Sequence, residues 1–175
     1  MAGDDLGAIG IGNSGVSMWT LIRALAYGTV FIGVLVVLVP SRILWIAGIP
    51  SPPVFGITQL FGLFLVLVGA AIVLSCILSF VFIGKGTQAP FDAPRRLVIR
   101  GPYRVTRNPM YVGVMAVLAG VAVYYGSVAL SIYAIAFWIA VHCYVIFSEE
   151  PALTRAFGNE YEEYCSRVGR WLPRL

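Results

Sequence analysis

Residues 57–83 read ITQLFGLFLVLVGAAIVLSCILSFVFI, and this run decides the fold because it carries no charged side chain. At a rise of 1.5 Å per residue, a helix of this length exceeds the ~30 Å hydrocarbon core of a bilayer. The run therefore predicts a membrane-spanning helix. Gly62 and Gly69 lie within it and are candidate points of close helix packing.

The composition of the whole chain agrees with a membrane protein. Of its 175 residues, 59% are hydrophobic and 11% are charged, whereas soluble domains average roughly 45–50% and about 25%. We expect one all-α domain, residues 1–175, in the membrane. The net charge of +4 comes mostly from basic residues that flank apolar runs. It favours lipid headgroups over nucleic acid, for which no binding motif is present.

Three further apolar runs predict the rest of a bundle of about four or five transmembrane helices. Pro40, Ser41 and Arg42 are expected to end the first of them. Gly126 and Ser127 separate the last two, which predicts an antiparallel helical hairpin. The three runs are Trp19–Val39, the short Met110–Tyr125, and Val128–Phe147.

The basic loop Gly84–Asn108 predicts the orientation, because cytoplasmic loops carry an excess of lysine and arginine. The polar tail from Ser148 lies on the same side, so loop and tail meet beside the hairpin. We expect an integral protein of a bacterial or archaeal inner membrane. Residues 1–83 would form its N-terminal transmembrane helices and residues 84–175 a cofactor-binding half, with the loop and the C-terminus in the cytoplasm.

The tail predicts two short amphipathic helices. Pro151 suits a first helical turn, and Gly158 suits the end of that helix. Asn159 and Glu162 resemble a capping box that opens the second helix. Apolar residues recur at helical spacing at Leu153, Phe157, Tyr161, Tyr164 and Val168.

Two patterns suggest chemistry that their context does not support. GIGNSG, Gly10–Gly15, matches a dinucleotide fingerprint by letter, but no strand-and-helix unit surrounds it. The cysteines Cys76, Cys143 and Cys165 show no metal-binding spacing, and we interpret them as packing residues.

The densest cationic stretch, RGPYRVTRNPMY at residues 100–111, predicts an anion site. Asn108 is a good N-cap and Pro109 a favoured first residue, so a helix should begin here. Its positive dipole end would lie beside arginines able to hold a carboxylate. The alternative is an anchor for lipid headgroups. The arginines are Arg100, Arg104 and Arg107.

Carboxylates follow the fourth apolar run at Glu149 and Glu150, and Glu149 should share a helix face with His142, seven residues earlier. The histidine could instead be a packed core residue, and the glutamates a solvated helix end. Arginines facing carboxylates suit a zwitterion, and S-adenosylmethionine also has a base and a sulfonium for aromatic rings to contact. The candidate aromatic residues are Tyr103, Tyr111, Tyr161, Tyr164 and Trp171.

The stretches RGPYRVTRNPMYVG and EEPALTRAFGNEYEEYCSRVGRWLP resemble the isoprenylcysteine carboxyl methyltransferase and phospholipid methyltransferase superfamily. The resemblance covers residues 95–175 and rests on G-P-Y-R, R-x-P-x-Y-x-G, the glutamate pair, F-G-x-x-Y-x-x-Y and R-W-L-P. It implies an integral membrane enzyme that uses S-adenosylmethionine, releases S-adenosylhomocysteine and needs no metal. A lipophilic substrate would enter from the membrane lipids.

The resemblance also implies residue roles. Arg107 would hold the cofactor and take part in catalysis, and Arg167 would orient an acceptor carboxylate. Family members often carry histidine where this chain has Asn108, which keeps the capping ability but not the charge. The other implied cofactor contacts are Arg104, Asn108, Pro109, Tyr111, His142, Glu149, Glu150 and Tyr161, with Trp171, Leu172 and Pro173 over the adenine.

Several functions stay open at this stage. An isoprenylcysteine-type carboxylate is the leading acceptor, and an aminophospholipid or a small lipophilic amine or thiol is the alternative. A membrane protein that binds anionic lipid or a partner without catalysis, and a membrane reductase that uses NADPH, are the competing hypotheses.

Overall fold

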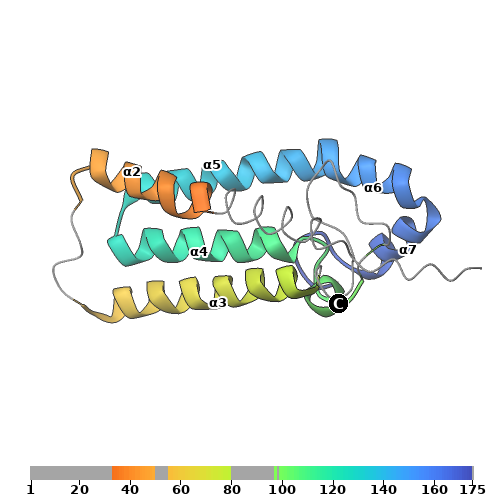
Figure 1. Ribbon diagram of the computed structural model, residues 1–175, viewed down its shortest axis with the longest axis horizontal. Helices are drawn as coiled ribbons and strands as arrows, with labels where there is room; N and C mark the ends of the chain where they lie inside the picture. Colours follow the sequence, from red (N-terminus) through yellow and green to blue (C-terminus); the bar gives the residue numbers. More distant parts are fainter. Residues whose placement is uncertain (1–32, 50–54, 80–96, 98, 175) are drawn as a thin grey trace, which may run out of the picture.

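Helices make up every regular element in the part of the chain that the structure, a computed structural model, describes: residues 33–49, 55–79, 97 and 99–174. Three long helices lie side by side, with α4 between α3 and α5, and a short helix α2 runs beside α5 (Figure 1). The prediction of an all-α fold is confirmed. The bounds are α2 Val39–Ile46, α3 Ile57–Ser79, α4 Pro109–Tyr125, α5 Val128–Tyr144, α6 Glu150–Phe157 and α7 Asn159–Arg167.

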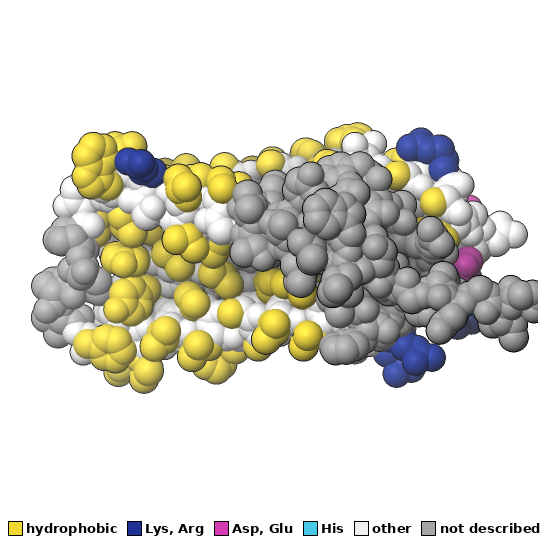
Figure 2. Space-filling model, viewed as in Figure 1, with side chains coloured by type: hydrophobic (Ala, Val, Ile, Leu, Met, Phe, Trp, Pro, Cys, Tyr) yellow, Lys and Arg dark blue, Asp and Glu magenta, His cyan; other side chains and the backbone are white. Residues whose placement is uncertain are grey.

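Two described helices are long and apolar enough to cross a membrane: Ile57–Ser79 and the continuous Val128–Phe157. The segments Val34–Ile46 and Pro109–Tyr125 are apolar but shorter. The 17 residues of α4 cover about 25 Å, less than a bilayer core of ~30 Å. Hydrophobic side chains are spread over the described part of the visible face of the bundle (Figure 2). A membrane helical bundle fits these helices, and the number of four or five spans stays a prediction.

Glycines bring α3 and α4 into backbone contact, as predicted for Gly62 and Gly69. A Cβ atom added at Gly69 would lie 2.5 Å from the carbonyl oxygen of Gly113. One added at Gly62 would lie 2.7 Å from the carbonyl oxygen of Gly120. Small residues allow this close approach of two helices in a membrane. We call these four glycines the glycine seam.

Pro40 and Pro151 each follow a π turn and lie in the first turn of an α-helix. Pro40 does not end the first apolar helix, because a π turn at Val34–Leu38 leads directly into α2. Pro151 lies in the first turn of α6, as predicted, although a second π turn at Val145–Glu149 joins α5 to α6 without a break. A π turn is wider than an α turn, so it can accommodate a residue that lacks an N–H group and has a bulky ring.

The first π turn shows how a freed carbonyl is satisfied. In π geometry the carbonyl of Leu35 would accept from the N–H of Pro40, which does not exist. The hydroxyl of Tyr133 on α5 donates to this carbonyl instead, at 2.9 Å. This bond also ties the first helix to α5.

The helix ends confirm some predicted caps and correct others. As predicted, α4 begins at Pro109, and Gly126, at φ 58°, separates it from α5. Asn108 does not cap α4 with its side chain. The capping box predicted at Asn159 is also wrong, because Gly158 precedes α7 and no side chain caps it. Gly158 does end α6 as expected, at φ 51°.

Some sequence predictions fall outside the described residues. They concern residues 19–32 of the first apolar run, the stretch Gly10–Gly15, residues 80–83 of the second apolar run, and residues 84–96 of the basic loop. The basic residues Lys85, Arg95 and Arg96 also belong to this part of the chain.

The glycine seam yields a stability prediction. Gly69→Ala should lower the apparent melting temperature in detergent, because overpacking costs about 1–3 kcal/mol and outweighs the helix-propensity gain of about 1 kcal/mol. Gly33→Ala is the matched control, since a Cβ atom there meets nothing within 4 Å. It should leave the melting temperature unchanged or higher. Equal stability of the two variants would contradict close packing at the seam.

Candidate functional site

The candidate site lies at the end of the bundle where α6, α7 and residues 105–108 come together (Figure 1). Tyr161, Tyr164 and Val168 of the α7 region form a buried cluster, against which Leu153 and Phe157 of α6 pack. The apolar stripe predicted for the tail is confirmed.

A hydrogen bond fastens this cluster to the cationic stretch. The hydroxyl of Tyr164 donates to the carbonyl of Tyr103 at 2.7 Å. Tyr103 lies in a short 3-10 helix, Gly101–Arg104, and is 7% exposed. The burial of the Tyr164 phenol raises its pKa, so it stays protonated and available as a donor.

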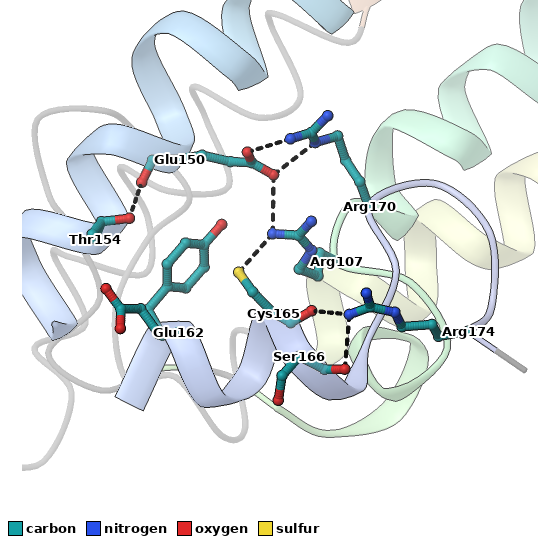
Figure 3. Close-up of a pocket in the computed structure, with 9 residues that line it drawn as sticks. Arg107, Glu150, Thr154, Glu162, Cys165, Ser166, Arg170 and Arg174 are labelled. Carbon is teal, nitrogen blue, oxygen red and sulfur yellow. Dashed lines mark hydrogen bonds and ion pairs between the residues drawn. The ribbon is translucent and has the colours of Figure 1, made fainter. Parts of the chain in front are cut away.

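Glu150 is the centre of the site, because two arginines from distant parts of the chain bind its carboxylate (Figure 3). Arg170 donates from Nε to Oε1 at 2.8 Å and from Nη2 to Oε2 at 2.7 Å. Arg107 lies 3.0 Å from Oε1 through Nη1. The Glu150 side chain is 17% exposed and that of Arg107 is 13% exposed. We call these three residues the Glu150 cluster.

The Glu150 cluster is held together by the backbone beside it. The carbonyl of Arg170 accepts from Thr106 Oγ1 at 2.8 Å and from Asn108 Nδ2 at 3.2 Å. The amide of Arg107 donates to the carbonyl of Gly169 at 2.9 Å. Asn108 therefore binds the tail instead of capping α4, which explains its missing cap bond.

Trp171 fastens the next residue of the tail to α5. Its Nε1 donates to Nδ1 of His142 at 3.1 Å. The indole also lies against Trp138, with ring centroids 4.4 Å apart. The tail from Gly169 to Trp171 is thus held by α5, α6 and the start of α4.

A pocket of about 550 Å³ opens beside the Glu150 cluster, within the range of about 300–1,000 Å³ typical of small-molecule sites. Five of its nine lining residues are charged, and Figure 3 shows Arg107, Glu150 and Arg170 meeting at one wall. The lining residues are Arg107, Glu150, Thr154, Tyr161, Glu162, Cys165, Ser166, Arg170 and Arg174.

The electrostatics of the pocket leave donors ready for a ligand. The hydrogen bonds to Glu150 raise the pKa of Arg170, and burial raises the pKa of Tyr161. Both groups therefore keep their protons. Nε of Arg107 is buried and has no hydrogen-bond partner among the described residues, an arrangement that costs free energy until an acceptor arrives.

Glu149 points to a different place from Glu150. Its Oε2 accepts from the hydroxyl of Tyr111 on α4 at 2.9 Å, and it does not line the pocket. The α-helical spacing that predicted a shared face for Glu149 and His142 is interrupted by the π turn at Val145–Glu149.

Other predicted site residues lie apart from the pocket lining. Arg104 is exposed on the 3-10 helix. Arg167 is 73% exposed and forms an ion pair with Glu163, one turn earlier on α7. Leu172 and Pro173 are also exposed, so the structure does not bring these four residues to the Glu150 cluster.

Sequence reasoning missed two residues at the centre of the site. Arg170 was part of the R-W-L-P motif, and its position next to Trp171 was the available signal. Cys165 was interpreted as a packing residue, but its Sγ accepts a hydrogen bond from Arg107 at the pocket wall. Nothing in the spacing of the cysteines indicated that contact.

With this geometry described, the comparison with known families becomes informative. The model of the phospholipid methyltransferase family matches residues 57–160, more than half of the chain. The chain belongs to the phospholipid methyltransferase family. No curated protein matches it. The matched region contains α3 to α6 with Arg107 and Glu150, and it ends before Arg170 and Trp171.

The Glu150 cluster predicts that substitutions of Arg170 and Arg167 affect the Arg107 amide differently. Arg170→Ala should speed hydrogen exchange at the Arg107 amide, because the tail loses a bidentate ion pair worth about 1–3 kcal/mol. Arg167→Ala should leave this exchange unchanged, because an exposed pair contributes at most about 1 kcal/mol. Equal protection of the Arg107 amide in both variants would contradict the role of Arg170 in holding the tail.

Proposed function

We propose that the protein is an integral membrane methyltransferase that transfers a methyl group from S-adenosylmethionine to a lipophilic acceptor. The observation that carries this proposal is the pairing of Arg107 with Glu150 at the wall of an open pocket, in a chain that belongs to a methyltransferase family. Family membership supports the reaction type. The donor and the acceptor are part of the proposal.

The residues of the pocket fit the donor. Arg107, whose Nε has no hydrogen-bond partner among the described residues, would bind the carboxylate of its methionine part. Glu150 would bind the ammonium group or the ribose hydroxyls. Tyr161 lines the same pocket and offers a ring to the base or the sulfonium. When bound, S-adenosylmethionine supplies an electrophilic methyl group on a positively charged sulfur.

The protein's own contribution would be alignment and exclusion of water, which methyl transfer needs more than acid–base groups. Glu150 is already neutralised by Arg107 and Arg170, so a ligand ammonium has to compete with a guanidinium for it. Binding would therefore rearrange the Glu150 cluster and the tail that carries Arg170. Trp171, held by His142, is placed to move with the same tail.

The acceptor would reach the site from the membrane, with the Glu150 cluster on the cytoplasmic side of a bacterial or archaeal inner membrane. The isoprenylcysteine-type carboxylate, expected first from the sequence, depended on Arg167. That residue is 73% exposed and paired with Glu163. The described pocket therefore offers no independent support for a carboxylate acceptor, and an amine acceptor is at least as compatible with it.

Calorimetric titration with S-adenosylhomocysteine in detergent tests the proposal against its competitors. A saturable heat is expected for a methyltransferase. A folded protein that shows none, but binds vesicles rich in phosphatidylglycerol, would instead be a lipid-binding protein without catalysis. Thermal stabilisation by NADPH and not by S-adenosylmethionine would indicate the reductase.

The pocket assignment predicts the effect of two substitutions. Arg107→Ala and Glu150→Gln should each weaken S-adenosylhomocysteine binding by about tenfold or more, because each removes a charged hydrogen-bond partner of the ligand. Glu163→Gln is the matched control, since that carboxylate is 63% exposed and lies outside the pocket lining. Unchanged affinity in both pocket variants would place the cofactor elsewhere.

A further inference from the structure

Two consecutive residues of the tail hold it to the long helix Val128–Phe157, which comprises α5, the π turn and α6. Arg170 binds the Glu150 carboxylate through two hydrogen bonds, at 2.8 and 2.7 Å. Trp171 donates from Nε1 to Nδ1 of His142 at 3.1 Å. In the described part of the chain, no other hydrogen bond or ion pair joins residues 169–174 to this helix.

The π turn explains how His142 and Glu150 can hold adjacent residues of the tail. In a regular α-helix two turns take about seven residues, which would place Glu149 on the same face as His142. A π turn holds one more residue than an α turn, so the eight steps from His142 to Glu150 complete about two turns. His142 and Glu150 therefore share the helix face against which the tail lies.

His142 contacts the tail and not the pocket. Neither His142 nor Trp171 belongs to the pocket lining. The centroid of the imidazole lies 5.9 Å from that of the Trp171 ring and 6.4 Å from that of the Trp138 ring. The family resemblance implied a cofactor contact for His142, whereas these distances favour a role that acts through Trp171.

A bound cofactor would affect the two tail contacts differently. Its ammonium group would compete with the Arg170 guanidinium for Glu150, so that one cation replaces another. The bond between Trp171 and His142 lies outside the pocket lining and would not be displaced. With Arg170 released, this bond would be the remaining polar link between the described tail and the long helix.

Movement of the tail would disturb the rest of the site. The Arg107 amide donates to the carbonyl of Gly169 at 2.9 Å, and Thr106 and Asn108 donate to the carbonyl of Arg170. A tail that left the long helix would therefore weaken the bonds that position Arg107, the proposed partner of the ligand carboxylate. A link that survives the release of Arg170 limits this movement.

From these contacts we propose that His142 is a positioning residue for cofactor binding. It keeps the tail on α5 through Trp171 while the ammonium group of the ligand takes the place of Arg170 at Glu150. In this role His142 touches neither the cofactor nor the acceptor. The inference rests on the proposed methyltransferase function, and it assigns the ammonium group, not the ribose, to Glu150.

A test without ligand replaces the effect of the cofactor with a substitution, in the whole protein in non-ionic detergent. Arg170→Ala removes the contact with Glu150, and His142→Phe keeps an aromatic ring but removes the acceptor for Trp171. His142→Phe alone should speed hydrogen exchange at the Arg107 amide by less than about twofold. In the Arg170→Ala background it should speed this exchange by about fivefold or more.

Two further variants separate the hydrogen bond from the packing of the ring. His142→Asn should restore most of the protection of the Arg107 amide, because its Oδ1 can accept from Trp171 in place of Nδ1. Cys143→Ser, at the neighbouring exposed position on α5, should have no effect in either background.

Equilibrium titration connects the tail contact to cofactor binding. S-adenosylhomocysteine should bind about fivefold more weakly to His142→Phe than to the wild type, and about equally to His142→Asn. The analogue of S-adenosylhomocysteine that lacks the α-ammonium group would leave Arg170 on Glu150. Its affinity should therefore change by less than about twofold in His142→Phe.

Three results would overturn the inference. One is an effect of His142→Phe on the Arg107 amide that is equal in both backgrounds. Another is an equal loss of affinity for S-adenosylhomocysteine and for the analogue, since His142 would then contact the adenine or act on the fold alone. The third is His142→Asn behaving like His142→Phe. Failure of the wild type to bind S-adenosylhomocysteine would instead contradict the proposed function, because the exchange measurement uses no ligand.

Discussion

The carboxylate of Glu150 holds the polar end of this protein together. It comes from α6, it is 17% exposed, and its partners Arg107 and Arg170 come from the start of α4 and from the tail. A carboxylate this deeply placed would be costly without such partners. The hydrogen bonds of Thr106, Asn108 and the Arg107 amide to the tail all lie next to this ion pair. A ligand that binds Glu150 would therefore change contacts of α6, of the start of α4 and of the tail together.

The packing of α3 on α4 and the π turn before α6 position the residues of the site. The glycine seam fixes α3 against α4 by backbone contact, so the first turn of α4, with Tyr111, has a defined place. The π turn at Val145–Glu149 lies directly before Glu150. Because of this turn, the side chains of Glu149 and Glu150 point in other directions than they would in a regular α-helix. One glutamate faces the tail and the other faces α4. Such π turns occur often at functional sites.

The sequence predicted the helical class, an apolar helix within residues 57–83, the start of α4 at Pro109 and the buried stripe on α7, because each depends on local pattern or on residues with a fixed backbone preference. It failed at Pro40, where a π turn lets the helix continue, since no residue type marks that turn. It could not separate Glu149 from Glu150, or Arg170 from Arg167. These distinctions depend on which way adjacent side chains point once the tail has folded back, and that is set by contacts between distant segments.

The most direct test of this account is a structure of the protein with S-adenosylhomocysteine. The account predicts the ligand in the pocket beside α7, with its carboxylate at Arg107, its ammonium or ribose at Glu150, and Glu149 still bonded to Tyr111. A ligand bound elsewhere, with the Glu150 cluster unchanged from the arrangement in Figure 3, would contradict it.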